Sequence, residues 1–301
     1  DHLKIMDAYI AVLRSGLVYG VCDSCYFNAT MIANGSTRDV WWYHPYNHGD
    51  EYNFYFEDNY WSGDGMQSCV SDGNYSPRYA FRFNTINISN IVRGGTSPMF
   101  DQHGNQPSPM WSSQGAEIYG NTIIQGAKGC FFYDQRGGKS LVYNNTFTGT
   151  GSAFSTRVRE EHADTSQPTG TNERGIAGEH QISGQPQHIS DSYYWNNTFN
   201  GTRVNCDPST YTAGMYIDYP DGRCPTENVH MWNQKDGFDG TSGIGVGPLA
   251  NRPVTCTIGV AYWATDTQTL YRCNATNVWT EYYRPYTYPH PLRSSLSSAG
   301  A

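Results

Sequence analysis

The sequence is poor in charge, and lysine is especially scarce. Only 15% of its 301 residues are charged, the formal net charge is −8, and the four lysines are Lys4, Lys128, Lys139 and Lys235. The basic residues are scattered, so the clustered positive footprint of a nucleic-acid-binding protein is missing. We therefore expect no nucleic-acid partner. An acidic substrate would need local arginines or a bound cation to offset the negative field.

Long apolar runs are also missing. No stretch approaches the roughly 18 consecutive apolar residues of a transmembrane helix, so we expect no membrane span. The first residues, DHLKIMDAYIAVLRSG, lack the basic-then-apolar order of a signal peptide and look like the inside of a repeat. We expect further repeats upstream in the natural gene.

What is abundant favours β-structure. The chain contains 24 Tyr, 8 Trp and 32 Gly, and it is rich in Asn, Ser and Thr. These are β-forming and turn-forming residues, and the aromatic content is too high for a disordered chain.

Eight cysteines form an even set. Cys22 and Cys25 have CxxC spacing, but no second CxxC or pair of histidines completes a zinc site, so disulfides are the stronger interpretation. Cys256 with Cys273 and Cys206 with Cys224 each bracket a short stretch and are predicted local disulfides. They indicate an oxidising compartment and a secreted or extracellular protein.

A repeat dominates the first two thirds of the chain. An alternating aromatic or aliphatic stretch ends in Asn, then Thr or an aromatic residue, then an apolar residue. The aligned asparagines are 25, 37, 24 and 52 residues apart, which indicates a repeat of about 22–25 residues with insertions. The segments are 54–61, 79–86, 116–123, 140–147 and 192–199, with asparagines Asn59, Asn84, Asn121, Asn145 and Asn197. A weaker copy at 19–27 has Cys25 in the Asn position.

Such a short coil of strands cannot bury its inner face alone and must stack on its neighbours. Stacked turns let successive Asn amides hydrogen-bond along the axis, and Asn tolerates left-handed backbone. We predict an all-β protein with the architecture of a right-handed parallel β-helix, a solenoid with long loop insertions and a small C-terminal β extension. A β-sandwich is the alternative, but the constant Asn-Thr ending has no role in one.

The Y-x-N-N-T-F segments resemble those of right-handed β-helix proteins of the pectate-lyase-like superfamily, which includes secreted bacterial proteins. The resemblance covers about residues 1–235 and implies the fold more strongly than an activity. The run Gly259–Leu292 resembles an extension found on uncharacterised bacterial β-helix proteins. The predicted organisation is a parallel β-helix over 1–235, a Gly-rich linker over 236–252 and an aromatic-rich C-terminal extension over 253–301.

Two aperiodic segments, 93–115 and 151–190, are rich in Gly, Pro, Ser and Gln. Loops this long are usually functional or disordered, and on a β-helix they would flank a groove over one sheet, where a polysaccharide can lie.

Charged residues gather in or beside these segments. Because successive coils stack about 4.8 Å apart, residues of neighbouring coils can meet on one face. Elimination from a polyuronate needs a cation or arginine for the substrate carboxylate and a base for the adjacent proton. The predicted set comprises Lys139, Arg136, His103 and Glu160 as catalytic residues, Arg157, Arg159, Trp41 and Trp42 as substrate-binding residues, and Asp101 and Asp134 as ligands of Ca²⁺.

Two alternatives stay open. Hydrolysis needs paired carboxylates, which Glu57-Asp58 with Asp64 or Glu160 with Asp134 would supply. The dense aromatic runs at 41–46 and 282–288 suit sugar stacking, but also subunit contacts in a homo-oligomer or filament. We therefore expect a carbohydrate-binding or carbohydrate-active protein, with a polysaccharide lyase as the enzymatic form. The alternative is a non-catalytic structural or adhesive component of an extracellular fibre, envelope or tailspike-like assembly.

Overall fold

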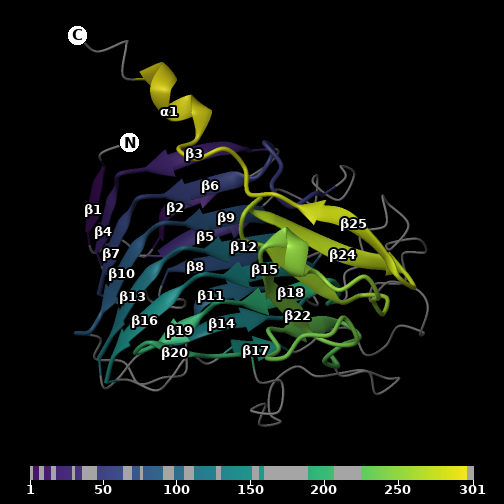
Figure 1. Cartoon of the computed structure of the whole chain (residues 1–301). Coiled ribbons are helices and arrows are strands. Elements are labelled where there is room, and N and C mark those ends of the chain that lie inside the picture. The colour runs from purple at the N-terminus through teal and green to yellow at the C-terminus, as the bar shows by residue number, and fades with distance from the viewer. Residues whose placement is uncertain are drawn as a thin grey trace, which may run out of the picture.

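In the computed structural model the repeats form three largely parallel sheets (Figure 1). The structure describes residues 3–6, 10–14, 18–28, 31–35, 46–63, 70–74, 77–90, 98–104, 112–126, 130–150, 156–158, 189–206 and 225–296.

The chain visits the three sheets in turn, so that within each sheet a strand generally pairs with the one three places later. Sheet A contains, in spatial order, β1 (Lys4–Met6), β4 (Tyr26–Asn28), β7 (Tyr60–Ser62), β10 (Thr85–Ile88), β13 (Thr122–Gln125), β16 (Thr146–Gly149), β19 (Thr198–Phe199) and the antiparallel β20 (Thr202–Arg203). Sheet B contains β2 (Ile10–Arg14), β5 (Met31–Gly35), β8 (Ser71–Asn74), β11 (Pro98–Gln102), β14 (Phe131–Gln135) and β17 (Thr156–Val158). Sheet C contains β3 (Gly20–Asp23), β6 (Phe54–Glu57), β9 (Arg78–Arg82), β12 (Gly115–Tyr119), β15 (Lys139–Tyr143), β18 (Ser192–Trp195) and β21 (Met231–Asn233). The arrangement is all-β and compatible with a β-helix-like solenoid.

A ladder of asparagine amides runs along the turns between sheets C and A. The Asn84 amide donates to Asn121 Oδ1 at 3.0 Å, and the Asn121 amide donates to Asn145 Oδ1 at 2.9 Å. Each oxygen also accepts a backbone N–H of the neighbouring coil. Asn59 and Asn197 extend the ladder, and the Cys25 N–H donates to Asn59 Oδ1, so Cys25 takes the Asn position as the repeat predicted.

The left-handed backbone of these turns belongs to the residue before each ladder position, not to the ladder asparagine. The φ angle is 57° at Asp58, 59° at Phe83, 67° at Gly120, 54° at Asn144 and 53° at Asn196. Asp, Asn and Gly tolerate this conformation, whereas a bulky residue such as Phe rarely adopts it.

The interior between the three sheets is filled by stacked aromatic and aliphatic side chains. Phe56 and Phe81 stack at 4.5 Å, and Phe100 and Phe132 continue the cluster from sheet B. On sheet C, Val142 points into this core, while its neighbours Leu141 and Tyr143 belong to a second cluster on the other face. Both faces of sheet C are therefore buried.

The second cluster is covered by the C-terminal sheet, whose strands are β22 (Ile244–Gly247), β23 (Ala261–Ala264), β24 (Thr269–Ala275) and β25 (Val278–Tyr283). Figure 1 shows β24 and β25 lying against the strands of sheet C. Trp263 and Tyr283 pack on Tyr143, which stacks on Trp195 at 4.2 Å. The predicted Cys256–Cys273 disulfide is present.

Two predicted boundaries differ from the structure. The expected linker 236–252 carries β22, which pairs with β23, and the 3₁₀ helix η3 (Leu249–Asn251). Gly245 is needed there because a Cβ would lie 2.2 Å from the Phe238 ring, so the glycines serve packing as well as turns. The aperiodic segments 93–115 and 151–190 contain β11 and β17, both strands of sheet B. The predicted disulfide of Cys206 with Cys224 is not formed: Cys206 is a thiol whose Sγ donates to the Thr156 carbonyl.

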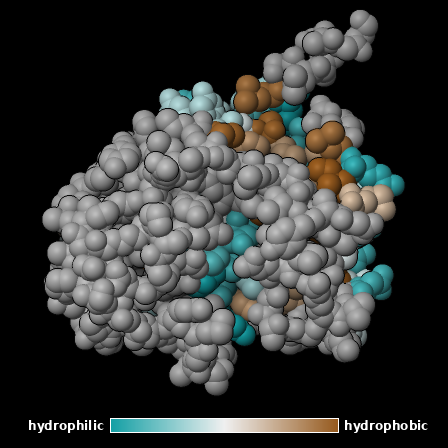
Figure 2. All heavy atoms as spheres, turned by 180° about the vertical axis from the view of Figure 1, so that it is seen from behind, coloured by the Kyte–Doolittle hydropathy of each residue, from teal (hydrophilic) through white to brown (hydrophobic). Residues whose placement is uncertain are grey.

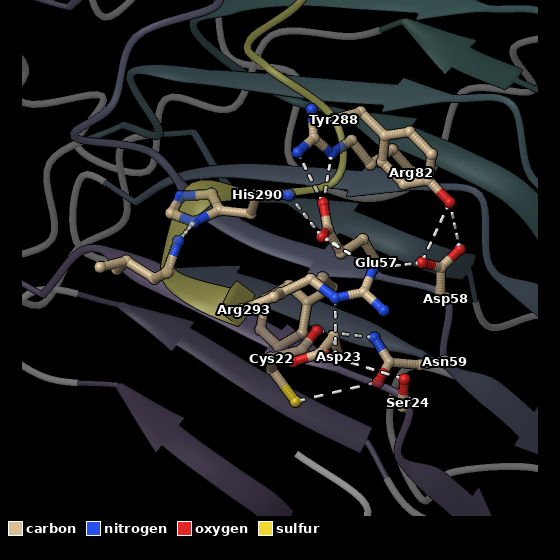
Figure 3. A network of polar contacts seen from close by, with 12 residues as sticks. Cys22, Asp23, Ser24, Glu57, Asp58, Asn59, Arg82, Tyr288, His290 and Arg293 are labelled. Carbon is tan, nitrogen blue, oxygen red and sulfur yellow. Dashed lines mark hydrogen bonds and ion pairs between the residues drawn. The ribbon is translucent and has the colours of Figure 1, made fainter. Parts of the chain in front are cut away.

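A C-terminal segment, residues 284–293, is held against the first coils by ion pairs and hydrogen bonds (Figure 3). Buried Glu57 binds Arg82 at 2.6 Å, accepts the His290 N–H at 2.9 Å and also contacts Arg293. Arg82 donates to the carbonyls of Tyr286 and Thr287. The last residues of the segment belong to α1 (Pro291–Leu296). No helix among the described residues is long and apolar enough to cross a membrane.

The ladder predicts that Asn121→Ala lowers the stability of the folded protein. The change removes a 1% exposed amide and leaves the Asn84 N–H, the Phe81 carbonyl and Asn145 Oδ1 each short of a partner. We expect the free energy of unfolding in urea to fall by about 3 kcal/mol or more, because several buried polar groups lose partners. Asn274→Ala, at an exposed position, should cost less than about 1 kcal/mol. Equal losses would contradict a structural role for the ladder.

Glu117 predicts a pH-dependent stability. Its carboxylate is fully buried beneath the C-terminal sheet and accepts the Gly49 N–H and the Tyr283 hydroxyl. Burial raises its pKa to about 7, and these hydrogen bonds only partly oppose the shift. The native state therefore holds this proton more tightly than the unfolded chain does. The folding stability that this proton contributes is fully present below the unfolded pKa of about 4.5 and is lost as the pH rises through about 7.

We expect the free energy of unfolding of Glu117→Gln to rise relative to that of the wild type as the pH increases. The rise should reach up to about 3 kcal/mol between pH about 4.5 and above 7. Urea unfolding of both proteins across this range measures the difference. Glu281→Gln, which changes an exposed carboxylate paired with Arg284, should show no such trend. A difference that is constant with pH would contradict the raised pKa.

Candidate functional site

An acidic column crosses the outer face of sheet B. Asp72 on β8 is aligned with Asp101 on β11, which is aligned with Asp134 on β14, and Asp134 is aligned with Arg157 on β17. Phe100, the neighbour of Asp101, is part of the interior cluster, so strand alternation directs Asp101 to the opposite face. Seen from behind, Figure 2 shows hydrophilic surface among the described residues at the centre of that side.

His103 and Arg136 lie two residues beyond Asp101 and Asp134, on the same face. The backbone N–H of His103 donates to the Gly73 carbonyl, and that of Arg136 donates to the Gln102 carbonyl, so the sheet's hydrogen bonding continues past the strand ends. This continuation holds both side chains beside the acidic column. Arg136 donates from Nε to Asp101 Oδ1 at 2.9 Å and from Nη2 to the same oxygen at 2.5 Å.

His103 Nε2 is the meeting point of the cluster. It lies 3.1 Å from Asp72 Oδ1, 3.5 Å from Asp101 Oδ2 and 2.6 Å from Arg136 Nη2. Unprotonated, Nε2 accepts a hydrogen bond from Arg136; protonated, it donates to Asp72. Both protonation states of the imidazole therefore have a partner in place, which suits a residue that takes up and releases a proton.

The cluster is largely withdrawn from solvent. Asp72 is 5% exposed, Asp101 8%, His103 7%, Asp134 2% and Arg136 6%. Burial raises the pKa of Asp101, although Arg136 and His103 act in the opposite direction. A carboxyl with a raised pKa beside an imidazole provides the unequal pair that acid–base chemistry uses.

A divalent cation has possible ligands here. One atom each of Asp72, Asp101 and His103 lie within 4.8 Å of one another. The set contains an imidazole nitrogen, whereas Ca²⁺ prefers six to eight oxygens. Arg136 already contacts Asp101 and His103, so its guanidinium supplies positive charge at the same place. Asp-Asp-His suits a transition metal better than Ca²⁺.

The structure therefore brings together four predicted residues, Asp101, His103, Asp134 and Arg136, and it adds Asp72. Lys139 contacts Asp191 at 3.6 Å at the start of β15 in sheet C, because the Gly137-Gly138 turn carries the chain out of sheet B. Arg157 lies in the acidic column with its guanidinium 3.9 Å from the centre of the Phe131 ring. Trp41, Trp42, Arg159 and Glu160 lie outside the described residues.

Asp72 was missed because its strand, Ser71-Asp-Gly-Asn74, has no apolar alternation. The only sequence signal for it was the downstream pattern of an Asp two residues before a charged or polar turn residue, as at Asp101–His103 and Asp134–Arg136.

Of the carboxylates considered for hydrolysis, Asp134 lies in this cluster, whereas its expected partner Glu160 lies outside the described residues. Glu57 and Asp58 both bind Arg293 of the C-terminal segment, and Asp64 lies outside the described residues (Figure 3). Of the aromatic run 282–288, Tyr283 is buried and donates to Glu117, so part of that run serves packing.

No known family model matches this chain, and no curated protein or solved structure does either.

Arg136→Met predicts an electrostatic defect. Without the guanidinium, three aligned carboxylates face one another with less compensation, so we expect the free energy of unfolding at neutral pH to fall by about 3–5 kcal/mol. The deficit should shrink as the pH falls, because protonation of the carboxyls removes their repulsion. Urea unfolding at neutral and acidic pH measures both values.

Adding Asp101→Asn to Arg136→Met should recover part of the stability at neutral pH, because one negative charge is removed. Arg284→Met, on an exposed ion pair, is the matched control and should change little. A loss from Arg136→Met that does not vary with pH would mean that the side chain acts through packing.

Proposed function

We propose that this chain is a secreted right-handed parallel β-helix of the pectate-lyase-like type that binds an acidic polysaccharide over sheet B and cleaves it by elimination. The observation that carries the proposal is the convergence of Asp72, Asp101, His103 and Arg136 on one outer face. The three parallel sheets and the asparagine ladder support the fold, and the Cys256–Cys273 disulfide supports an oxidising compartment.

The position of the cluster suits a long substrate. The outer face of sheet C is covered by the C-terminal sheet, whereas the acidic column runs across several strands of sheet B. The Gly-, Pro- and Ser-rich segments adjoin β11 and β17 in the sequence. A polymer lying across successive strands would pass the aligned side chains one sugar after another.

In the proposed reaction Arg136 binds the substrate carboxylate and stabilises the negative charge that develops when the adjacent C–H is deprotonated. His103 Nε2 removes that proton. The C–H electron pair forms a C=C bond, and the neighbouring C–O bond breaks with its electrons on the glycosidic oxygen. This oxygen takes up a proton from water.

Calcium remains a prediction. The oxygens of Asp72, Asp101 and Asp134 would have to hold it, with Arg136 displaced from Asp101. Activity that is lost on chelation and restored by Ca²⁺ would support the ion. Activity that survives chelation would assign charge neutralisation to Arg136 alone.

The test is release of unsaturated products, followed by their ultraviolet absorbance, from polygalacturonate, alginate and other polyuronates. We expect His103→Ala and Arg136→Ala each to lower kcat/KM by about 10²-fold or more, the usual contribution of a general base or of a charge-stabilising group. Lys139→Ala is the matched control: it lies in sheet C and should leave the rate within about threefold of the wild type.

The absence of unsaturated products from every polyuronate would refute the elimination proposal. It would favour the non-catalytic alternative, a structural or adhesive protein. A wild type that binds polyuronates without cleaving them, and loses binding in Arg136→Ala, would confine sheet B to carbohydrate recognition. A rate lost in Lys139→Ala but kept in His103→Ala would transfer the role of base to Lys139.

A further inference from the structure

A pocket lies away from sheet B, where the turns that follow sheet C meet the C-terminal segment. Its volume is about 360 Å³, within the usual range for a small-ligand site. It is lined by Phe83, Tyr119, Gly120, Tyr143, Asn144, Thr267, Gln268, Arg284, Pro285, Tyr286, Thr287 and Tyr288. We call it the turn pocket.

Phe83 is the unexpected residue of the turn pocket. It occupies the left-handed position before a ladder asparagine, with φ of 59°, where the other coils have Ser24, Asp58, Gly120, Asn144 or Asn196. A bulky side chain in this conformation is strained by roughly 1–3 kcal/mol, and such strain clusters at functional sites. Phe83 is also 38% exposed, so its ring is not fully used in packing.

The surroundings are arranged to hold this ring in place. Gly120 allows it to lie close, because a Cβ there would come within 2.7 Å of the Phe83 ring. The ring of Tyr288 lies 4.2 Å from that of Phe83, and the Tyr288 hydroxyl donates to Asp58 (Figure 3). Tyr288 is 48% exposed. Two rings are thus fixed at the edge of a pocket while still presenting surface to solvent.

The polar groups of the turn pocket suit a neutral ligand. Asn144, Thr267, Gln268 and Thr287 offer amides and hydroxyls. Among the described lining residues only Arg284 is charged, and it donates to Glu281 from Nε at 2.6 Å and from Nη2 at 2.9 Å, which neutralises it. Asp58 and Arg82, just outside, are likewise paired with Arg293 and Glu57. An anion would find little net positive charge here.

From these observations we infer that the turn pocket binds a neutral sugar ring. The C–H face of a pyranose packs on aromatic faces, which carry a partial negative charge, and its hydroxyls pair with amides and hydroxyls at the rim. The site differs from sheet B in position, charge and chemistry. The inference therefore does not depend on the proposed elimination.

The probes are cellotetraose, maltotetraose, xylotetraose and mannotetraose, with tetragalacturonate as the charged comparison, titrated into the full chain by calorimetry. We expect at least one neutral oligosaccharide to bind. Tyr288→Ala should weaken that binding about tenfold by removing one aromatic contact. Tyr288→Phe keeps the ring and loses only the hydrogen bond to Asp58, so it should weaken binding much less than Tyr288→Ala.

Asn144→Gly and Asn196→Gly form a matched pair. Both replace a left-handed asparagine of the same turn position, and glycine is the natural residue there at Gly120, so both variants should fold. Only Asn144 lines the turn pocket. We expect Asn144→Gly to weaken neutral-sugar binding several-fold, as for one lost hydrogen bond, and Asn196→Gly to have no effect.

The inference is overturned if no neutral oligosaccharide binds at millimolar concentration, if only tetragalacturonate binds, or if the two asparagine variants bind equally. Should Tyr288→Ala fail to fold, the asparagine pair still decides. Asp101→Asn separates the two sites: it should leave neutral-sugar binding intact even if it abolishes cleavage of polyuronates. Loss of neutral-sugar binding in Asp101→Asn would place that binding on sheet B and contradict the turn pocket.

Discussion

The asparagine ladder is the interaction on which the rest of this structure depends. Its members are 25, 37, 24 and 52 residues apart, yet each amide reaches the next at about the same distance. Coils of unequal length are thus aligned at one point in every turn. Because each ladder oxygen also accepts a backbone N–H of the next coil, a mismatch would leave buried polar groups without partners. The ladder therefore sets a common register for the strands of all three sheets. The insertions lie in the segments between strands.

In-register stacking has an electrostatic consequence on sheet B. Like residues at like positions become neighbours about 4.8 Å apart, so Asp72, Asp101 and Asp134 are forced side by side. Such a column is stable only if positive charge lies next to it, and Arg136, just beyond the end of β14, provides it. The cluster is thus a product of register and alternation rather than of any local motif. Its residues come from separate coils, each carrying only one or two of them.

The predictable parts of the protein were those with a local signal. The Asn-Thr ending identified the ladder, the coils and even the substitution by Cys25, because the same chemistry recurs at each turn. The strands of sheet B gave no such signal: Ser71–Asn74 contains no apolar residue, and Pro98–Gln102 lies in a segment without periodicity. Asp101, His103 and Arg136 could be grouped from stacking alone. Asp72 could not, and Lys139 was misplaced because the sequence does not show that Gly137-Gly138 turns the chain into another sheet.

The outer faces of sheets B and C carry different side chains, charged on sheet B and aromatic on sheet C. The outer face of sheet C carries Tyr119, Tyr143 and Trp195, and the C-terminal sheet buries that aromatic row. Covering it requires the chain to return across the first coils, where Glu57 and Arg82 hold residues 284–293 by charge. The return path crosses the left-handed turns before the ladder, and a pocket forms where its rings meet Phe83. Asparagine or glycine at position 83 would have closed the turn without strain. The strained Phe83 is explained if this turn also presents an aromatic face to a ligand beside neutral polar groups. The charged side chains lie elsewhere, on sheet B.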